Sequence, residues 1–383
     1  MTITNSIMAG GCAALTALAL MPGPASAETS DPPEPPSRSE LQRQAEAIVD
    51  AGAPGVSITV RDENGEWNGA AGVGDIRTGA PPDPNGLVRI GSVTKSFTAT
   101  MVLQMVEEGS LRLDDPIDRY LPGLLPYEEP ISIRDLLQHR SGLPNYADML
   151  WPDARAASEV RFRRFTPTRL VGMATDDPLK FPPGTDFSYS DTGYIVLGML
   201  IEELADDSFA AELRQRILWP AGLRHTYVAG DFPLFPHPAL RGYEALGDTS
   251  GELTDLTAFN MSGSWSAGAI VSTSGDVNEF YRKLLAGDLL TTPMLEEMQR
   301  TIPAFPAFEY GLGLAGGEFC GQEVWGHVGG VPGYMTYSFT RSDGARQITV
   351  TANRSLSAPP EVAEAVFAMV KAEFCGTPET TRT

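Results

Sequence analysis

The chain contains 383 residues, of which 42% are hydrophobic and 8% aromatic, so it has enough apolar material for one large domain or two. Its formal net charge is −21, and no basic cluster offsets the excess of acidic residues. Such an acidic chain repels polyphosphate, so the composition argues against a nucleic-acid partner.

The amino-terminal residues are typical of an export signal. An apolar run from Ala13 to Leu20 precedes Ala25-Ser26-Ala27, which has the small-x-small pattern of a cleavage site before Glu28. We therefore predict a signal peptide over residues 1–27, cleavage after Ala27 and a secreted protein. A disordered apolar tail is the alternative, because residues 1–11 contain no basic residue. No other apolar run is long enough to span a bilayer, so we expect no stable membrane span after processing.

Extended and helical patterns then follow along the chain. Residues 28–40 are rich in Pro, Ser and Asp and are predicted to form a linker. Two β-rich runs around the turn Asp62-Glu63-Asn64-Gly65 predict a hairpin within residues 54–76. Residues 111–260 contain helical segments broken by Pro and Gly. Strand patterns return at residues 324–327, 334–340 and 347–352, and residues 361–374 are predicted to form the last helix.

Strands near both ends with helices between them predict an α/β fold, in the form of an α+β sandwich. We expect one antiparallel sheet, built from both ends of the chain and flanked by helices, together with an all-helical insertion. The predicted parts are an α/β domain of residues 41–100 and 262–376, a mainly helical domain of residues 101–261 and a disordered tail of residues 377–383. The active site of such a fold commonly lies in the crevice between the two parts.

The candidate nucleophile lies where the two predicted domains meet. Ser92 and Lys95 are three residues apart at the start of a helix, which the spacing of Phe97, Met101 and Met105 predicts. A serine and a lysine at this spacing share one face of the helix, near the positive end of its dipole. Serine becomes a good nucleophile when an adjacent base takes its proton. The alternative is an ordinary N-cap serine, since Ser-x-x-Lys is a short pattern.

Tyr189-Ser190-Asp191 is the second candidate element, and an apolar helix, residues 194–204, follows it. A phenol beside a lysine can act as a base, because the neighbouring cation favours its ionised form. The alternatives are a core aromatic residue for Tyr189 and an N-cap for Asp191.

The third candidate element, Gly326-His327-Val328-Gly329-Gly330, has the pattern of a strand whose glycines let another backbone approach. The remaining histidines, His139, His225 and His237, lie in loop-like contexts and are expected to be structural. No two histidines have a metal-ligand spacing, and the chain contains no phosphate-binding loop motif. We therefore expect neither a metal nor a cofactor.

In this order, Ser-x-x-Lys, Tyr-x-Asp and His-x-Gly resemble the three motifs of the serine penicillin-recognising enzymes. With a tyrosine in its second motif, the chain resembles the branch that contains the class C β-lactamases. With a histidine in its third motif, it resembles the secreted D-alanyl-D-alanine carboxypeptidases of that branch. Further likeness lies in residues 136–143, 187–190 and 310–314, and the resemblance covers nearly all of residues 41–376. It implies a β-lactamase/transpeptidase-like fold and a serine-type hydrolase.

The resemblance also implies a role for each motif residue. Ser92 would attack a carbonyl and form an acyl-enzyme, while Lys95 and Tyr189 would move the proton to the leaving group. The backbone N–H groups of Ser92 and Gly330 would form the oxyanion hole. His327 would donate a hydrogen bond into the same site. The residues expected to contact the substrate are Asp191, Val328, Gly329 and Gly330.

Four residues depart from the carboxypeptidase pattern. Asp191 replaces the usual Asn, Val328 replaces a common Thr, and Gly330 replaces a residue with a hydroxyl group. Ala315 aligns with an arginine that pairs with the terminal carboxylate in those enzymes. Each lost hydrogen bond to a charged group is worth about 1.5–3 kcal/mol, so we expect weakened recognition of a free carboxylate.

The sequence therefore predicts a secreted hydrolase that acts through an acyl-enzyme on peptide-like amides or esters, of the D-alanyl-D-alanine carboxypeptidase type but with weak carboxylate recognition. An arginine such as Arg140 or Arg161 could restore that recognition. The alternatives are an esterase, a β-lactamase-like hydrolase and a slow penicillin-binding or cell-wall-binding protein. The expected partner is a small peptide, an ester, a β-lactam or a cell-wall peptide, and we expect a monomer.

Two cysteines, Cys320 and Cys375, remain after the predicted cleavage site. Two cysteines in an exported chain suggest one disulfide, with two buried thiols as the alternative. They also fall where the secreted carboxypeptidases pair a disulfide.

Overall fold

The computed structural model describes residues 35–247 and 251–376. The predicted signal peptide, residues 1–27, and the predicted tail, residues 377–383, lie outside the described residues. Among the described helices, none is long and apolar enough to cross a membrane.

The first helix begins inside the predicted linker. Helix α1 (Arg38–Asp50) starts after Ser37, whose Oγ accepts a hydrogen bond from the Glu40 N–H at 3.2 Å. Such an N-cap satisfies one of the backbone donors that a helix start leaves free. The predicted linker boundary at residue 40 was therefore wrong, because the serine that resembled linker sequence is the helix cap.

One antiparallel sheet joins the two ends of the chain, as the sequence predicted. Within the described residues, eight strands are arranged in the order β2-β1-β13-β12-β11-β10-β9-β8. β1 pairs with β13, from Val56 opposite Ala352 to Arg61 opposite Gln347. The strands are β1 (Gly55–Asp62), β2 (Gly65–Gly72), β8 (Ile302–Phe305), β9 (Phe308–Tyr310), β10 (Ala315–Phe319), β11 (Gln322–Val331), β12 (Tyr334–Arg341) and β13 (Gln347–Ala352).

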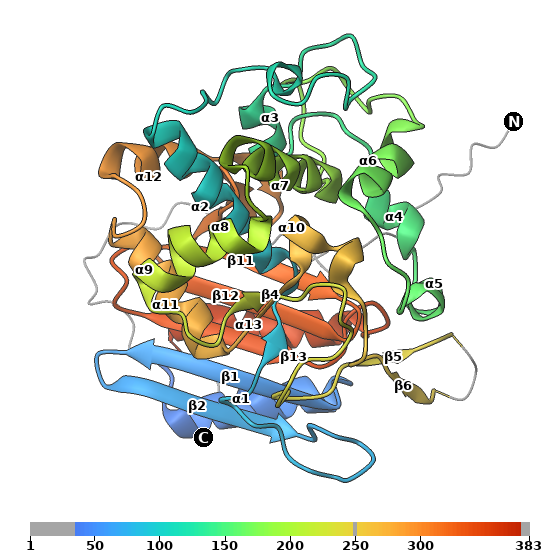
Figure 1. Cartoon of the computed structure of the whole chain (residues 1–383). Helices are drawn as coiled ribbons and strands as arrows, with labels where there is room; N and C mark the ends of the chain where they lie inside the picture. Colours follow the sequence, from blue (N-terminus) through green and yellow to red (C-terminus); the bar gives the residue numbers. More distant parts are fainter. Residues whose placement is uncertain (1–34, 248–250, 377–383) are drawn as a thin grey trace, which may run out of the picture.

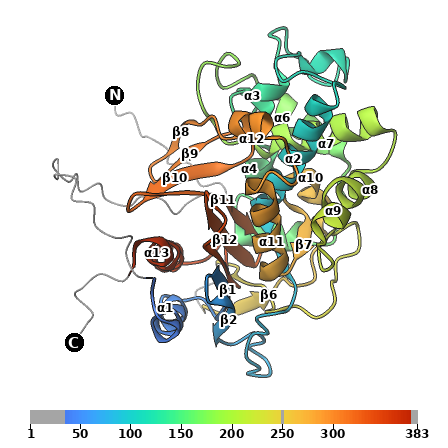
Figure 2. The same ribbon diagram turned by 90° about the vertical axis from the view of Figure 1, so that its left-hand side faces the viewer.

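Helices cover both faces of the sheet. Figure 2 shows α1 and α13 (Pro360–Cys375) on one side and α2 (Thr94–Glu107) and α11 (Ser274–Leu285) on the other. Most of the helical part lies above the sheet in Figure 1. Its helices are α3 (Ile133–Leu137), α4 (Tyr146–Leu150), α5 (Ala154–Val160), α6 (Pro167–Thr175), α7 (Asp191–Ala205), α8 (Phe209–Leu213) and α9 (Trp219–Ala221), and α10 (Trp265–Gly268) and α12 (Thr292–Met298) follow in the chain.

The helical insertion also contains short strands. β4 (Tyr227–Val228) pairs with β7 (Ile270–Ser272), which also pairs with β3 (Val88–Arg89). β5 (Tyr243–Ala245) pairs with β6 (Leu253–Asp255). Strands of two or three residues are too short to show an alternating pattern, so they could not be predicted from the sequence.

The described apolar side chains form one core on each face of the sheet. Ile58, Phe339 and Val366 belong to the core beneath α1 and α13. Phe97 and Phe280 belong to the core on the other face, where their rings stack with centroids 3.7 Å apart. Burying a large apolar side chain contributes roughly 1.5–3 kcal/mol. This second core fixes α2, the helix that follows Ser92, against the sheet.

A disulfide joins Cys320 to Cys375, with the two Cα atoms 5.3 Å apart. It links the turn after β10 to the last residue of α13. The sequence left the disulfide and the free thiols open, and the structure contains the disulfide.

Near this disulfide, α13 buries an acidic side chain without a hydrogen bond. The Glu373 side chain is 1% exposed, and its closest cation is the Arg346 Nε at 4.0 Å. Neither carboxyl oxygen has a hydrogen-bond partner among the described residues. Burial raises the pKa of Glu373 to about 8, although the charges of Arg346 and Arg38 oppose the shift.

We expect Glu373→Gln to stabilise the protein increasingly as the pH rises. The folded carboxyl holds its proton up to a pKa of about 8, whereas an ordinary glutamate loses it near 4.5. Between these values the unfolded chain binds fewer protons, so the free energy of unfolding of the wild type falls by up to about 1.4 kcal/mol per pH unit. Glutamine does not titrate, so the variant escapes this loss. Urea unfolding of both proteins across this pH range measures the difference.

The matched control is Glu364→Gln on the exposed side of the same helix. It should leave the pH dependence of stability unchanged. A Glu373→Gln effect of equal size at every pH would contradict the raised pKa.

Candidate active site

Ser92 and Lys95 lie side by side where β3 passes into α2. Ser92 is in a 3₁₀ turn, Gly91–Val93, and is partly exposed, while Lys95 is in the first turn of α2 with its side chain fully buried. The Lys95 Nζ lies 3.0 Å from the Ser92 Oγ. The predicted pair is therefore formed, and Ser92 is the more exposed of the two residues.

The glycines of β11 let its backbone touch the Ser92 turn. A Cβ at Gly329 would lie 2.0 Å from the Ile90 O and 3.1 Å from the Ser92 N, and a Cβ at Gly91 would lie 2.8 Å from the Gly330 N. Only residues without a side chain fit such a contact. The two amide nitrogens expected to form the oxyanion hole, those of Ser92 and Gly330, thus lie at this contact.

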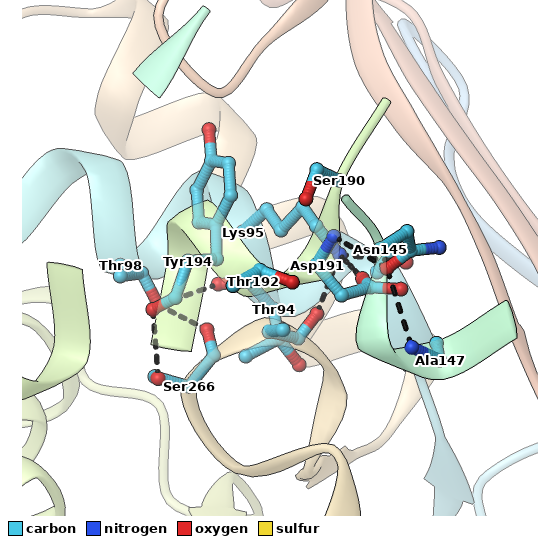
Figure 3. A network of polar contacts seen from close by, with 12 residues as sticks. Thr94, Lys95, Thr98, Asn145, Ala147, Ser190, Asp191, Thr192, Tyr194 and Ser266 are labelled. Carbon is cyan, nitrogen blue, oxygen red and sulfur yellow. Dashed lines mark hydrogen bonds and ion pairs between the residues drawn. The ribbon is translucent and has the colours of Figure 1, made fainter. Parts of the chain in front are cut away.

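Lys95 is held by acceptors from three segments. Its Nζ donates to the Ser92 Oγ at 3.0 Å, to the Asp191 Oδ1 at 2.5 Å and to the Ala267 O at 2.9 Å. Figure 3 shows the Asp191 carboxylate directed toward Lys95 from the start of α7. The N-cap of α7 is Ser190, so the interpretation of Asp191 as an N-cap was wrong. A carboxylate at this distance stabilises the charged form of the lysine.

The ring of Tyr189 faces the same ammonium. The Lys95 Nζ lies 5.0 Å from the centroid of the Tyr189 ring and 5.4 Å from that of Tyr194. Tyr189 itself is partly exposed. A cation beside a phenol favours the phenolate form of that phenol.

His327 lies close to the site, but both nitrogens of its ring are hydrogen-bonded to other protein groups. Its Nδ1 lies 2.6 Å from the Val328 O and its Nε2 lies 2.9 Å from the Tyr310 Oη. A carbonyl only accepts, so the proton is on Nδ1 and Tyr310 donates to Nε2. Burial and the charge of Lys95 lower the pKa of His327 to about 3, so the ring is neutral. The prediction that His327 donates a hydrogen bond into the site was therefore wrong, because both ring nitrogens are bonded to other protein groups.

Two site residues lay outside the sequence motifs. Asn145 accepts a hydrogen bond from the Asp191 N–H at 3.0 Å and donates to the Asp148 carboxylate at 2.9 Å. Figure 3 shows Asn145 beside Asp191, opposite Lys95. His139, predicted to be structural, packs its ring on Tyr189 with the centroids 4.1 Å apart. His139 lies within the stretch 136–143 that resembles the family, which was the one available signal.

A third unexpected residue supplies a hydroxyl group beside β11. The Ser355 Oγ lies 3.3 Å from the position that a Cβ at Gly330 would occupy. The carboxylate of Glu244 holds this loop, since it accepts hydrogen bonds from the N–H groups of Ser355, Leu356 and Ser357. A hydroxyl group from another segment therefore lies next to Gly330.

The two arginines considered as carboxylate partners are bonded to main-chain carbonyls. Arg140 donates to the Gly184 O, and Arg161 donates to the Asp255 O at 3.5 Å. Ala315, at the position of the expected arginine, is buried in β10 opposite Gly326.

A serine beside a buried lysine, with backbone amides at the same contact, has the composition of an acyl-transfer site. The chain matches the Beta-lactamase family model over residues 41–373, and it therefore belongs to the β-lactamase family. This confirms the resemblance to the penicillin-recognising enzymes that the motifs indicated.

Solved structures and a curated relative agree with this assignment. A D-stereospecific amidohydrolase from Streptomyces sp. is 33% identical, with a TM-score of 0.80 over 90% of this chain and 100% of its own. The D-amino acid amidase from Ochrobactrum anthropi SV3, complexed with L-phenylalanine, is 28% identical, with a TM-score of 0.75 over 87% of this chain and 97% of its own. Penicillin-binding protein 4* of Bacillus subtilis (strain 168) is 29% identical over 301 residues, which are 74% of this chain. The match spans 64% of that relative's length, which is less than two thirds.

We expect Asp191→Asn to move the acid limb of the pH–rate profile for acylation of Ser92 to lower pH. Without the carboxylate at 2.5 Å, the positive charge of Lys95 is no longer compensated, so the phenolate of Tyr189 forms at lower pH. A displacement of about one pH unit would correspond to about 1.4 kcal/mol of interaction. The acylation rate of a fluorescent penicillin, measured from about pH 5 to about pH 9, gives the profile.

The matched control is Asp114→Asn, which removes a carboxylate that is 76% exposed and paired with Arg134. It should leave the profile in place. An unchanged profile for Asp191→Asn, with only a lower melting temperature, would show that Asp191 is structural.

Proposed function

We propose that the protein is a secreted, monomeric serine hydrolase that cleaves small neutral amides and esters through an acyl-enzyme on Ser92. The observation that carries the proposal is the 3.0 Å contact between the Ser92 Oγ and the buried Lys95 Nζ, at the point where β11 meets the Ser92 turn. Membership of the β-lactamase family supports the serine chemistry. The pattern at residues 1–27 supports export.

The reaction proceeds in two steps. The Ser92 Oγ attacks the substrate carbonyl, and the N–H groups of Ser92 and Gly330 stabilise the oxyanion. The bond to the leaving amine or alcohol breaks, and Tyr189 passes the proton that it took from Ser92 to that group. Water then attacks the ester on Ser92, which releases the acid and restores the hydroxyl group.

The ion pair between Asp191 and Lys95 determines which residue accepts the proton from Ser92. Asp191 holds Lys95 in its charged form, so the lysine is a poor proton acceptor in the resting state. The same charge lies 5.0 Å from the centroid of the Tyr189 ring and favours its phenolate. Tyr189 therefore takes the proton from Ser92, and Lys95 orients the hydroxyl group and stabilises the phenolate.

The surroundings of β11 favour neutral substrates over acid-terminated peptides. A carboxylate that enters a partly dry site needs a cation or several donors. Val328 and Ala315 offer neither, and Arg140 and Arg161 are bonded to main-chain carbonyls. Ser355 adds a neutral hydroxyl group next to Gly330, which suits an amide or ester oxygen.

The comparisons favour an acyl group of D configuration. One structural relative is a D-stereospecific amidohydrolase and the other is a D-amino acid amidase. A D-alanyl-D-alanine carboxypeptidase uses the same acyl chemistry, but it must also bind a terminal carboxylate. Amides and esters of D-residues are therefore the preferred class, and acid-terminated peptides the weaker one.

We expect an acyl-D-Ala methyl ester to be cleaved faster than the matching acid-terminated depsipeptide, by about 100-fold or more in kcat/KM. Two missing contacts to a charged group, each worth about 1.5–3 kcal/mol, account for a ratio of this size. The L-Ala methyl ester should be cleaved more slowly than the D form. Initial rates with the three substrates measure both ratios.

Other outcomes identify the alternatives. Efficient cleavage of the acid-terminated substrate, abolished by Arg140→Ala or Arg161→Ala, would establish a carboxypeptidase. Rapid turnover of nitrocefin would indicate a β-lactamase. Labelling by penicillin without turnover of any substrate would indicate a slow penicillin-binding protein.

A further inference from the structure

His139 is a buried histidine that packs directly against Tyr189. It follows α3, is 1% exposed and has a backbone φ of +58°. Its ring centroid lies 4.1 Å from that of Tyr189, with the two planes tilted by 36°. The rings of Tyr310, Tyr194 and Phe187 also pack around it, with centroids at 4.9 Å, 5.2 Å and 6.0 Å.

The same residue is bonded to the backbone on both sides of Tyr189. The Ser188 N–H donates to the His139 carbonyl at 3.0 Å. The Ser190 N–H donates to the His139 Nδ1 at 3.2 Å. Tyr189 is thus bracketed by two hydrogen bonds to one residue and covered by the ring of that residue.

These bonds fix the tautomer of His139. Because Nδ1 accepts from a backbone N–H, the neutral ring carries its proton on Nε2. Among the described residues, Nε2 has no hydrogen-bond partner. Burial and the charge of Lys95 lower the pKa of His139 well below its usual 6.5, so the acceptor remains available at neutral pH.

We propose that His139 is a positioning residue that holds Tyr189 against Lys95, through the amides of Ser188 and Ser190 and through the contact between the rings. This inference rests on the proposed function, because it assumes that Tyr189 takes the proton from Ser92. A displacement of about 1 Å in a reacting group can lower the rate by about 100-fold. A residue that fixes Tyr189 on three sides therefore sets the rate of acylation.

The two effects of His139 can be separated by substitution. His139→Asn keeps an acceptor close to the position of Nδ1 and tolerates a positive φ. His139→Phe keeps a ring against Tyr189 but leaves the Ser190 N–H without an acceptor. His139→Gln places its polar end near Nε2 and also removes the acceptor, so it serves as a second test where His139→Phe folds poorly. The matched control is His225→Asn, since the side chain of His225 is 68% exposed.

Two readouts are measured on each variant of the full chain. The first is the rate constant of acylation at saturating fluorescent penicillin, together with the concentration that gives half of that rate. The second is hydrogen exchange of the amides of residues 188–190, which does not require activity. Substitution of a residue that only fills space would change the stability of the protein. It would not lower the acylation rate constant while leaving the half-saturating concentration unchanged.

We expect His139→Phe and His139→Gln to lower the acylation rate constant by about 10- to 100-fold, with a half-saturating concentration changed by less than about threefold. Both should also speed exchange at Ser190. His139→Asn should stay within about fivefold of the wild type in acylation and should protect Ser190, and His225→Asn should match the wild type.

Several results would overturn the inference. One is faster exchange at Ser190 with an unchanged acylation rate in His139→Phe. Another is a His139→Asn protein that acylates as slowly as His139→Phe. If the wild type is not acylated at all, the proposed function fails, and exchange still decides whether His139 holds the segment. Unchanged protection of Ser190 in His139→Phe would then refute the positioning role as well.

Discussion

The buried ammonium group of Lys95 is the interaction on which the site depends. A charge without solvent exposure has to be paired and hydrogen-bonded. Its acceptors come from the Ser92 turn, from the start of α7 at Asp191 and from α10 at Ala267. These segments are far apart in the sequence, so one charge fixes how the helical part meets the sheet beside the nucleophile.

The charge of Lys95 also influences the protonation of the neighbouring histidine and tyrosine side chains. It adds to burial in keeping the two site histidines neutral, so His139 and His327 act as hydrogen-bonding partners with a fixed tautomer. Asp191 keeps the ammonium charged, and the charge in turn favours the phenolate of Tyr189. These two charge effects lead to the proposed chemistry, in which Tyr189 accepts the proton from Ser92.

The sequence predicted what local patterns determine and missed contacts between segments. The Ser92–Lys95 pair follows from helix spacing, and the sheet follows from strand patterns at both ends of the chain. The sequence alone did not determine whether the Asp191 side chain points toward Lys95, because an aspartate before an apolar helix fits an N-cap equally well. The partners of His327 lie on its own strand and on β9, and neither leaves a periodic signal. His139 was missed for the same reason, since its bonds to residues 188 and 190 cross about fifty positions of the chain.

Mass spectrometry of the protein after incubation with a β-lactam tests directly whether Ser92 is the nucleophile and Lys95 its activating partner. We expect one covalent adduct, on the peptide that contains Ser92. The adduct should be absent from Ser92→Ala and should form far more slowly in Lys95→Ala. An adduct that persists on Ser92→Ala, or forms at the wild-type rate in Lys95→Ala, would contradict these roles.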